Sequence, residues 1–276
     1  MTKLSRRVFL GSAPAAAAAA GVFGTLFSSA AEAAINWDDT YNVIVIGAGG
    51  AGLSAAVSAK EAGCKKVVVL EKMMFAGGNT IRAGGGFNAA IKADYEKAGI
   101  KDSPDLHAQQ TLAAGDGRGD PVLVHQLTEK APESVQWLKD HGVKFEDHIY
   151  QIYAGLYKRA RNPIGPRGGA YIKALLEVCK KEDIPILYNT RVVEIIREHQ
   201  LSGRVLGVKV EQKGGKTLYL RALNGVVAAA GGFAANDRLT AIHDPRMGQL
   251  DTTNHPGATG DVLIDLVDIG AGTRGL

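Results

Sequence analysis

The segment GAGGAG at residues 47–52 constrains this chain more than any other feature. It directly follows a short, β-branched apolar run at residues 41–46 and precedes an Ala-rich stretch at residues 53–62 that predicts a helix. A second apolar run, residues 66–70, ends at Glu71. Strand, glycine loop, helix, strand and acidic residue thus follow one another within about 30 residues, which is the βαβ arrangement that binds dinucleotides.

The residue types explain the chemistry expected of this loop. Gly47 permits the tight turn, Gly49 lacks a Cβ so that a pyrophosphate can approach the backbone, and Gly52 allows the helix to pack closely on the strand. The helix N-terminus offers unpaired N–H groups and positive partial charge to the phosphates. Glu71 is expected to accept hydrogen bonds from ribose hydroxyls. The alternative is a glycine-rich turn that holds no ligand.

A second glycine-rich stretch, residues 77–88, follows the acidic residue and favours FAD over NAD. A plain NAD-binding domain would normally start its next helix there. A second glycine-rich backbone instead lets the chain lie along a longer ligand, such as the ribityl chain and isoalloxazine ring of a flavin. An ordinary surface loop, and with it a plain NAD enzyme, is the alternative.

The remaining pattern predicts an α/β fold: a Rossmann-like FAD-binding domain with a parallel central sheet and a small antiparallel β-meander. Helices are expected at residues 105–114, 121–141, 171–181 and 261–266. Strands are expected at residues 184–187, 189–196, 205–211, 217–220 and 225–233, the third and fourth of them forming a hairpin.

A basic loop broken by glycine and proline occupies residues 150–170 and carries Arg159, Arg161 and Arg167. Composition alone leaves two interpretations open. The loop is either a solvated turn, or it binds an anion or a substrate beside the flavin. Under the second interpretation any of these arginines could bind a carboxylate.

The first 33 residues predict an export signal. A twin-arginine pattern, SRRVFL at residues 5–10, precedes an Ala-rich run at 13–27 and an AEA cleavage site at 31–33. The run is only about 15 residues and weakly apolar, so a membrane anchor is disfavoured and no stable span is expected after cleavage. The mature chain is therefore expected to be a periplasmic FAD-binding domain at residues 34–276, loaded with cofactor before export.

Composition and residue spacing exclude other classes of function. The net charge of +4 comes without a clustered basic stripe, so no nucleic-acid partner is expected. Cys64 and Cys179 form no CxxC or haem-attachment motif and are interpreted as buried thiols. No metal site is predicted, because metal-ligand spacing is lacking among four histidines: His107, His125, His141 and His148.

Several segments together resemble the flavoprotein of the fumarate reductase and succinate dehydrogenase family. The likeness is strongest to exported flavocytochrome c fumarate reductases and to relatives that act on other unsaturated acids. It runs from about residue 41 to residue 260. The matching segments are VIGAGGAG at 45–52, LEK at 70–72, GGNT at 77–80, AGGGFNAA at 83–90, NTR at 189–191, AGGF at 230–233 and TNHPGATGD at 253–261.

The resemblance implies which residues contact FAD: Ala51, Glu71, Asn79, Thr80, Gly85 and Gly86. It places Val193 near the adenine and Asp261 near the ribityl or pyrophosphate region. With the neighbouring motif residues, the predicted cofactor-binding set is Gly47, Gly49, Gly50, Ala51, Gly52, Glu71, Lys72, Gly78, Asn79, Thr80, Gly84, Gly85, Gly86, Val193, Ala230, Gly231 and Asp261. Some family members attach FAD through a histidine, but no histidine occupies that position beside Asn79, so non-covalent binding is expected.

The resemblance also implies a reaction. Hydride passes from flavin N5 to the C=C bond of a small α,β-unsaturated carboxylate, an arginine delivers the proton, and a separate haem or quinol-linked partner supplies electrons. The family's His-Arg-Pro is replaced by Arg161-Asn162-Pro163, which favours an enoate related to fumarate. The family's catalytic arginine, clamp domain and C-terminal flavin segment would lie beyond Leu276, so no catalytic residue is assigned. The alternatives are a truncated or split flavin-binding module without turnover, and a related FAD dehydrogenase acting in the oxidative direction.

Overall fold

The computed structural model describes residues 35–153 and 155–273, and the predicted export signal lies outside these ranges. The described residues form a six-stranded sheet with the strand order β5-β2-β1-β8-β7-β6 and a two-stranded sheet of β3 and β4. The strands are β1 (Asp39–Ile46), β2 (Val67–Leu70), β3 (Phe87–Asn88), β4 (Ala160–Arg161), β5 (Ile186–Leu187), β6 (Thr190–His199), β7 (Ser202–Gln212) and β8 (Thr217–Ala228).

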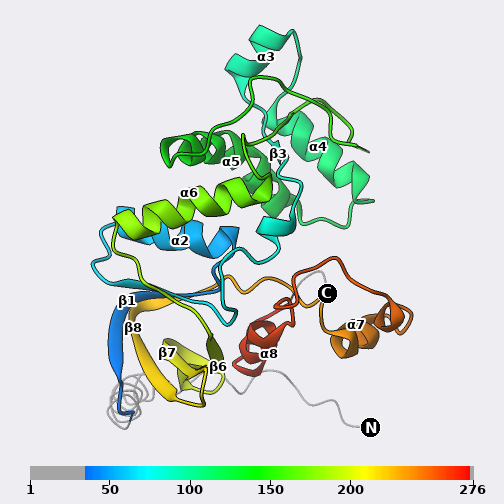
Figure 1. Ribbon diagram of the computed structural model, residues 1–276. Coiled ribbons are helices and arrows are strands. Elements are labelled where there is room, and N and C mark those ends of the chain that lie inside the picture. The colour runs from blue at the N-terminus through cyan, green and yellow to red at the C-terminus, as the bar shows by residue number, and fades with distance from the viewer. Residues whose placement is uncertain (1–34, 154, 274–276) are drawn as a thin grey trace, which may run out of the picture.

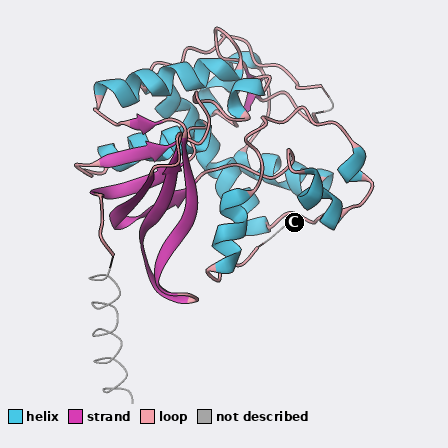
Figure 2. Cartoon of the chain, turned by 60° about the horizontal axis from the view of Figure 1, so that its bottom comes forward, coloured by secondary structure: helices cyan, strands magenta, loops and turns pink. Residues whose placement is uncertain are grey.

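The large sheet joins a parallel half to an antiparallel half, and β8 belongs to both. β1 pairs in parallel with β2 on one side and with β8 on the other, and β2 pairs in parallel with β5. β6, β7 and β8 pair antiparallel in sequence order. The predicted α/β fold, with its parallel central sheet and antiparallel meander, is confirmed. Figure 2 shows the strands gathered into one twisted sheet beside the helices.

One strand prediction was wrong. The sequence predicted separate strands at 217–220 and 225–233, but the structure has the single strand β8, which ends at Ala228. Its register against β1 shifts between the pairs Tyr41–Ala222 and Val43–Gly225. This irregularity absorbs the polar Asn224 without breaking the strand, which is why a break in the apolar pattern did not mean a turn.

The described residues contain seven α-helices and two 3₁₀ turns. The α-helices are α2 (Gly50–Glu61), α3 (Lys92–Ala98), α4 (Pro104–Ala114), α5 (Pro121–Asp140), α6 (Gly168–Lys181), α7 (Asp237–His243) and α8 (Asp261–Asp268), and the 3₁₀ turns are η1 (Thr80–Arg82) and η2 (Met247–Gln249). The predicted helices at 105–114, 121–141, 171–181 and 261–266 are all present. Residues 168–170 were assigned to the basic loop, but they form the first turn of α6.

Two apolar clusters hold the sheet between its covering layers. On one face, side chains of α2 and α6, including Leu53 and Leu175, pack against Val45 and Val69 of the parallel strands. On the other face, β6, β7 and Val262 of α8 cover the remaining side chains of β1 and β2. Figure 1 shows α2 and α6 side by side above the sheet and α8 beside the meander. Burial on both faces explains why β2 is apolar at every position.

A second group of elements lies beyond α6 and consists of α3, α4, α5, β3 and β4 (Figure 1). Its helix starts follow directly from the sequence. Ser103 caps α4 by accepting a hydrogen bond from the Leu106 N–H, and Asp120 caps α5 in the same way through Val122. Both helices carry proline at their first position, where no N–H is needed. None of the helices in the described ranges has the length and apolarity needed to cross a lipid bilayer.

The prediction of buried thiols is confirmed for Cys179 but not for Cys64. Both are free, Cys179 is buried under α2, and Cys64 is half-buried. Burial raises the pKa of the Cys179 thiol to about 11, so it stays protonated at neutral pH. Trp137 packs against the same core cluster, and its Nε1–H donates to Glu61 Oε2 at 3.0 Å.

Candidate functional site

A cavity of about 420 Å³ opens at the carboxyl ends of the parallel strands. Ile46, Leu70 and Ala228, the last residues of β1, β2 and β8, all line it. The rest of its wall comes from the glycine loop, the start of β6 and the segment before α8. Ligands of open α/β sheets bind at this position, because the loops that leave the strands diverge there.

The three motif glycines are required for different reasons. Gly47 has a φ of +102°, and a Cβ there would lie 2.6 Å from the carbonyl oxygen of Ala229. A Cβ at Gly52 would lie 1.8 Å from the carbonyl oxygen of Gly47. At Gly49 a Cβ would meet only the carbonyl oxygen of Gly77, at 3.9 Å, and would otherwise enter the cavity. The fold therefore needs Gly47 and Gly52, whereas Gly49 keeps space for a ligand.

The N-terminus of α2 forms one wall of the cavity and suits an anion. Gly49 is its N-cap and offers no side-chain cap, and the first turn carries no acidic residue. The Gly50 N–H donates to Thr80 Oγ1 at 3.0 Å, which ties the helix start to η1. Gly50 and Ala51 both line the cavity. The free N–H groups of this turn and the helix dipole supply the positive partial charge that a pyrophosphate requires.

Glu71 holds the glycine loop in position through its carboxylate. The residue is 7% exposed, and its Oε2 accepts a hydrogen bond from the Ala48 N–H at 2.8 Å. Its Oε1 accepts one from the Met73 N–H, also at 2.8 Å. A carboxylate oxygen can accept more than one hydrogen bond, so the carboxylate fixes the loop and still has capacity for ribose hydroxyls. The sequence predicted the second role and missed the first.

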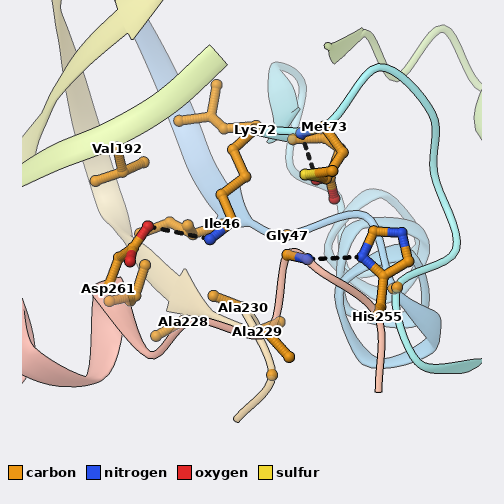
Figure 3. A pocket seen from close by; sticks show the side chains of 18 of the residues that line it. Ile46, Gly47, Lys72, Met73, Val192, Ala228, Ala229, Ala230, His255 and Asp261 are labelled. Carbon is orange, nitrogen blue, oxygen red and sulfur yellow. Dashed lines mark hydrogen bonds and ion pairs between the residues drawn. The ribbon is translucent and has the colours of Figure 1, made fainter. Parts of the chain in front are cut away.

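A charged cluster closes the side of the cavity near α8. Lys72 Nζ donates to Asp261 Oδ2 at 3.0 Å, and Arg191 Nε lies 3.3 Å from the same oxygen. Burial alone would raise the pKa of Asp261. The hydrogen bonds from Thr259 and Lys72, with the charges of Lys72 and Arg191, nevertheless hold that pKa below its ordinary value. Figure 3 shows Lys72 reaching across the cavity to Asp261 beside Val192.

The segment before α8 adds a histidine that the sequence reasoning did not select. His255 is 4% exposed and lines the cavity, on the side opposite Asp261 (Figure 3). Its Nδ1 accepts a hydrogen bond from the Gly257 N–H at 3.0 Å, and its backbone N–H donates to Asn79 Oδ1 at 2.6 Å. Asn79 also donates to Asn254 Oδ1 at 2.7 Å. The signal was the segment TNHPGATGD, of which only Asp261 was chosen.

The structure brings most of the predicted cofactor-binding residues together. Those that line the cavity are Gly47, Gly49, Gly50, Ala51, Glu71, Lys72, Gly78, Asn79, Thr80, Ala230, Gly231 and Asp261. Those outside its lining are Gly52, Gly84, Gly85, Gly86 and Val193. Val193 falls at a register irregularity of β6, and its neighbours Arg191 and Val192 line the cavity. Side chains alternate between the two faces of a sheet, so a register shift of one residue changes the face on which a side chain lies.

The second glycine stretch packs against the basic loop. A Cβ at Gly85 would lie 2.8 Å from the backbone carbon of Arg167, and one at Gly86 would lie 2.6 Å from the Tyr150 hydroxyl oxygen. The Tyr171 hydroxyl donates to the Gly85 carbonyl at 2.6 Å. These glycines therefore permit close packing between two segments far apart in the sequence.

Two arginines of the basic loop are buried in ion pairs, so the solvated-turn interpretation is wrong for them. Arg159 forms two hydrogen bonds with Asp102, at 2.9 and 2.8 Å, and a third with Gln110. Arg161 pairs with Asp94 and donates to the Ala89 carbonyl. Both guanidinium groups bind the protein's own carboxylates, so neither is a free site for a substrate carboxylate. Arg167 is exposed and has no ion pair within the described residues.

Comparison with known proteins identifies the family. The model of the FAD binding domain family matches residues 42–267, so the chain belongs to this family of FAD-binding domains and FAD is its cofactor. The cavity fits this cofactor. It presents an uncapped helix N-terminus, a loop position where a Cβ would intrude, and an acid at the end of the second strand.

Three similar proteins are a fumarate oxidoreductase, an acrylate reductase subunit and a fumarate reductase. The chain is 36% identical over 236 residues to NADH:fumarate oxidoreductase of Klebsiella pneumoniae, covering 85% of this chain and 25% of that protein. It is 32% identical to the acrylate reductase flavoprotein subunit of Shewanella woodyi, covering 97% and 54%. A flavocytochrome c3 fumarate reductase in its open conformation superposes with a TM-score of 0.81 at 30% identity, covering 88% and 43%. The chain thus spans between a quarter and about half of these relatives.

Proposed function

We propose that this chain is the FAD-binding part of an oxidoreductase that reduces the C=C bond of a small α,β-unsaturated carboxylate. The observation that carries the proposal is the chemistry shared by the relatives. Fumarate, acrylate and urocanate reductases are 32–36% identical to this chain over more than four fifths of its length. All three acids contain a C=C bond conjugated to a carboxylate, so the substrate class is common although the acids differ.

The residues of the cavity have defined roles in this proposal. The N-terminus of α2 binds the pyrophosphate, Glu71 holds the glycine loop and receives the ribose, and Asp261 with Lys72 borders the other end of the cofactor. When bound, FAD supplies the hydride at its N5 atom. We assign no proton donor within this chain. Arg159 and Arg161 are already paired with carboxylates, so Arg167 is the arginine of the basic loop that we expect to bind a substrate anion.

Two alternatives have support of their own. A 3-ketosteroid-Δ4-(5α)-dehydrogenase of Rhodococcus jostii superposes with a TM-score of 0.77 at 26% identity, which favours a related dehydrogenase acting in the oxidative direction. The second alternative is a flavin-binding module without turnover by itself. The chain spans 25% and 54% of the length of two reductase relatives, so the activity of this chain needs a direct assay.

One experiment distinguishes the proposed reductase from the two alternatives. The full chain is purified, its flavin spectrum is recorded, and fumarate, acrylate and urocanate are each offered with reduced methyl viologen. Oxidation of the viologen by one acid, with formation of the saturated acid, is the expected result. Flavin reduction by a saturated substrate instead would favour the dehydrogenase. A flavin-loaded chain that reacts with none of them would favour the module, and a folded chain without flavin would contradict the cofactor assignment.

We also propose that residues 1–33 direct a single FAD-binding domain, residues 34–276, to the periplasm, where a haem or quinol-linked partner reduces it. The support is the SRRVFL pattern and the AEA site of the sequence. Replacing Arg6 and Arg7 with lysine should leave flavin-loaded protein in the cytoplasm. Periplasmic fractions that still contain the R6K/R7K variant would contradict export by the twin-arginine route.

A further inference from the structure

Three side chains with metal-binding atoms converge between α4 and α5, away from the FAD cavity. Asp105 belongs to α4, and His125 and Glu129 belong to α5. Their ligand atoms all lie within 4.8 Å of one another. We propose that these residues form a site for a divalent transition metal ion that links the two helices.

The backbone explains why the three side chains meet. His125 and Glu129 are four residues apart in a continuous helix, so they lie on the same face, one turn apart. Asp105 lies in the first turn of α4, whose start is fixed by the Ser103 cap. The capping hydrogen bond from the Leu106 N–H to Ser103 Oγ is 3.0 Å long. The site is therefore built on two capped helices that pack against each other, which holds its ligands more firmly than loops would.

The only cation whose charge is shown to interact with the three side chains in the described residues is Lys130, which acts on Glu129. None of the three forms a hydrogen bond or an ion pair there through its side chain. The neighbouring cation, Lys130, is held by Glu133 at 2.8 Å. Asp105 and Glu129 are exposed and His125 is half-buried, so an ion can reach them from solvent. Two carboxylates this close repel each other, and a bound cation would relieve that repulsion.

The donor set selects the kind of metal. Ca²⁺ and Mg²⁺ prefer oxygen ligands alone, whereas an imidazole nitrogen suits Zn²⁺ and its neighbours in the first transition series. One nitrogen and two carboxylate oxygens provide three protein ligands, and water would complete the coordination. The sequence did not indicate this site, because Asp105 is remote from the other two residues in the chain and only the packing of α4 on α5 brings it to them.

Zinc titration of the full chain without an affinity tag tests the proposal. Calorimetry should show saturable binding of one Zn²⁺ at the site, and Zn²⁺ should raise the unfolding temperature because it binds only the folded state. His125→Ala and Glu129→Gln should each weaken zinc binding by at least about tenfold. Binding should also weaken in acid, because protons compete with the metal ion for the ligand atoms.

The matched control is His148→Ala. His148 is also near a carboxylate, with its Nδ1 3.5 Å from Glu146 Oε2, but the described residues place no third metal-binding side chain beside this pair. This variant should bind zinc as the unmodified chain does. Glu129→Gln preserves shape on an exposed helix position, so its circular dichroism spectrum should be unchanged. Absence of saturable zinc binding, or equal binding by the His125→Ala and Glu129→Gln variants, would overturn the proposal.

Discussion

The two lobes of this molecule bury different kinds of side chain. The sheet lobe, formed by the six-stranded sheet with α2, α6 and α8, has two large core clusters made of apolar residues such as Ile44 and Leu53. The helical lobe, formed by α3, α4, α5, β3 and β4, has only small apolar clusters. Its interior also contains the Arg159–Asp102 ion pair, whose side chains are 6% and 0% exposed.

This difference determines how each lobe responds to change. Apolar burial is non-directional and is shared among many contacts, so the sheet lobe can lose one side chain and keep its architecture. A buried ion pair depends on both partners, because removing one leaves an uncompensated charge in a poorly solvated place. The glycine loop at residues 47–52 belongs to the sheet lobe. The FAD cavity therefore lies in the lobe that we expect to tolerate substitutions better.

The largest expected effect is in the helical lobe. Asp102→Ala should lower the free energy of unfolding by about 3–5 kcal/mol, because Arg159 then stays buried without its carboxylate. Chemical denaturation of the variant measures this change. The double variant Asp102→Leu with Arg159→Met should recover most of the loss, since no unpaired charge remains. Glu133→Gln, which breaks an exposed pair, should leave the midpoint unchanged. If the Asp102→Ala variant were as stable as the original chain, the helical lobe would not depend on this buried ion pair.

Truncating a buried apolar side chain in the sheet lobe should lower stability but leave FAD binding intact. Leu53 is fully buried between α2 and the sheet, so Leu53→Ala should cost about 2–5 kcal/mol. FAD at saturating concentration should still bind, which the flavin absorbance of the purified variant reports. Leu127→Ala is the control, because Leu127 is 64% exposed on α5. Equal destabilisation by both variants would mean that burial does not set the effect.

The glycine loop allows fold and ligand to be separated within the sheet lobe. Gly49→Ala should weaken FAD binding by about tenfold and leave stability nearly unchanged, because its Cβ would enter the cavity and contact little protein. Gly52→Ala should destabilise the fold by about 3 kcal/mol or more, because its Cβ collides with the Gly47 carbonyl. Flavin fluorescence titration and thermal unfolding measure the two effects. If Gly49→Ala bound FAD normally, the pyrophosphate would not approach this position.

The smallest expected effect is a pH dependence in the helical lobe. Burial first, and the Arg159 charge second, lower the pKa of His107 below 6.5 in the folded state. The unfolded chain therefore binds a proton at this residue before the folded chain does, and stability falls as the pH drops below about 6.5. In His107→Gln this part of the decline should be absent. Unfolding free energies of both proteins at pH 7.5 and 5.5 give the difference, and parallel slopes would show that His107 contributes nothing.

The sequence predicted the sheet lobe better than the helical lobe. The run from β1 through the glycine loop and α2 to Glu71 uses only neighbouring residues and known periodicities, so its prediction was accurate. The helices predicted at 105–114 and 121–141 were likewise found, as α4 and α5. The basic loop was different, because composition cannot tell whether Arg159 faces solvent or Asp102. That outcome depends on a partner 57 residues away.

The sequence by itself determined the class of fold, the position of the dinucleotide loop and the choice of FAD, because these depend on short-range patterns of glycine and apolar residues. Only the tertiary structure decided which predicted residues share one cavity. In that structure Arg191, Val192 and His255 also line the cavity, and Glu71 accepts a hydrogen bond from the glycine loop. Strand register and packing between distant segments place these groups, and both follow from burial across the whole fold.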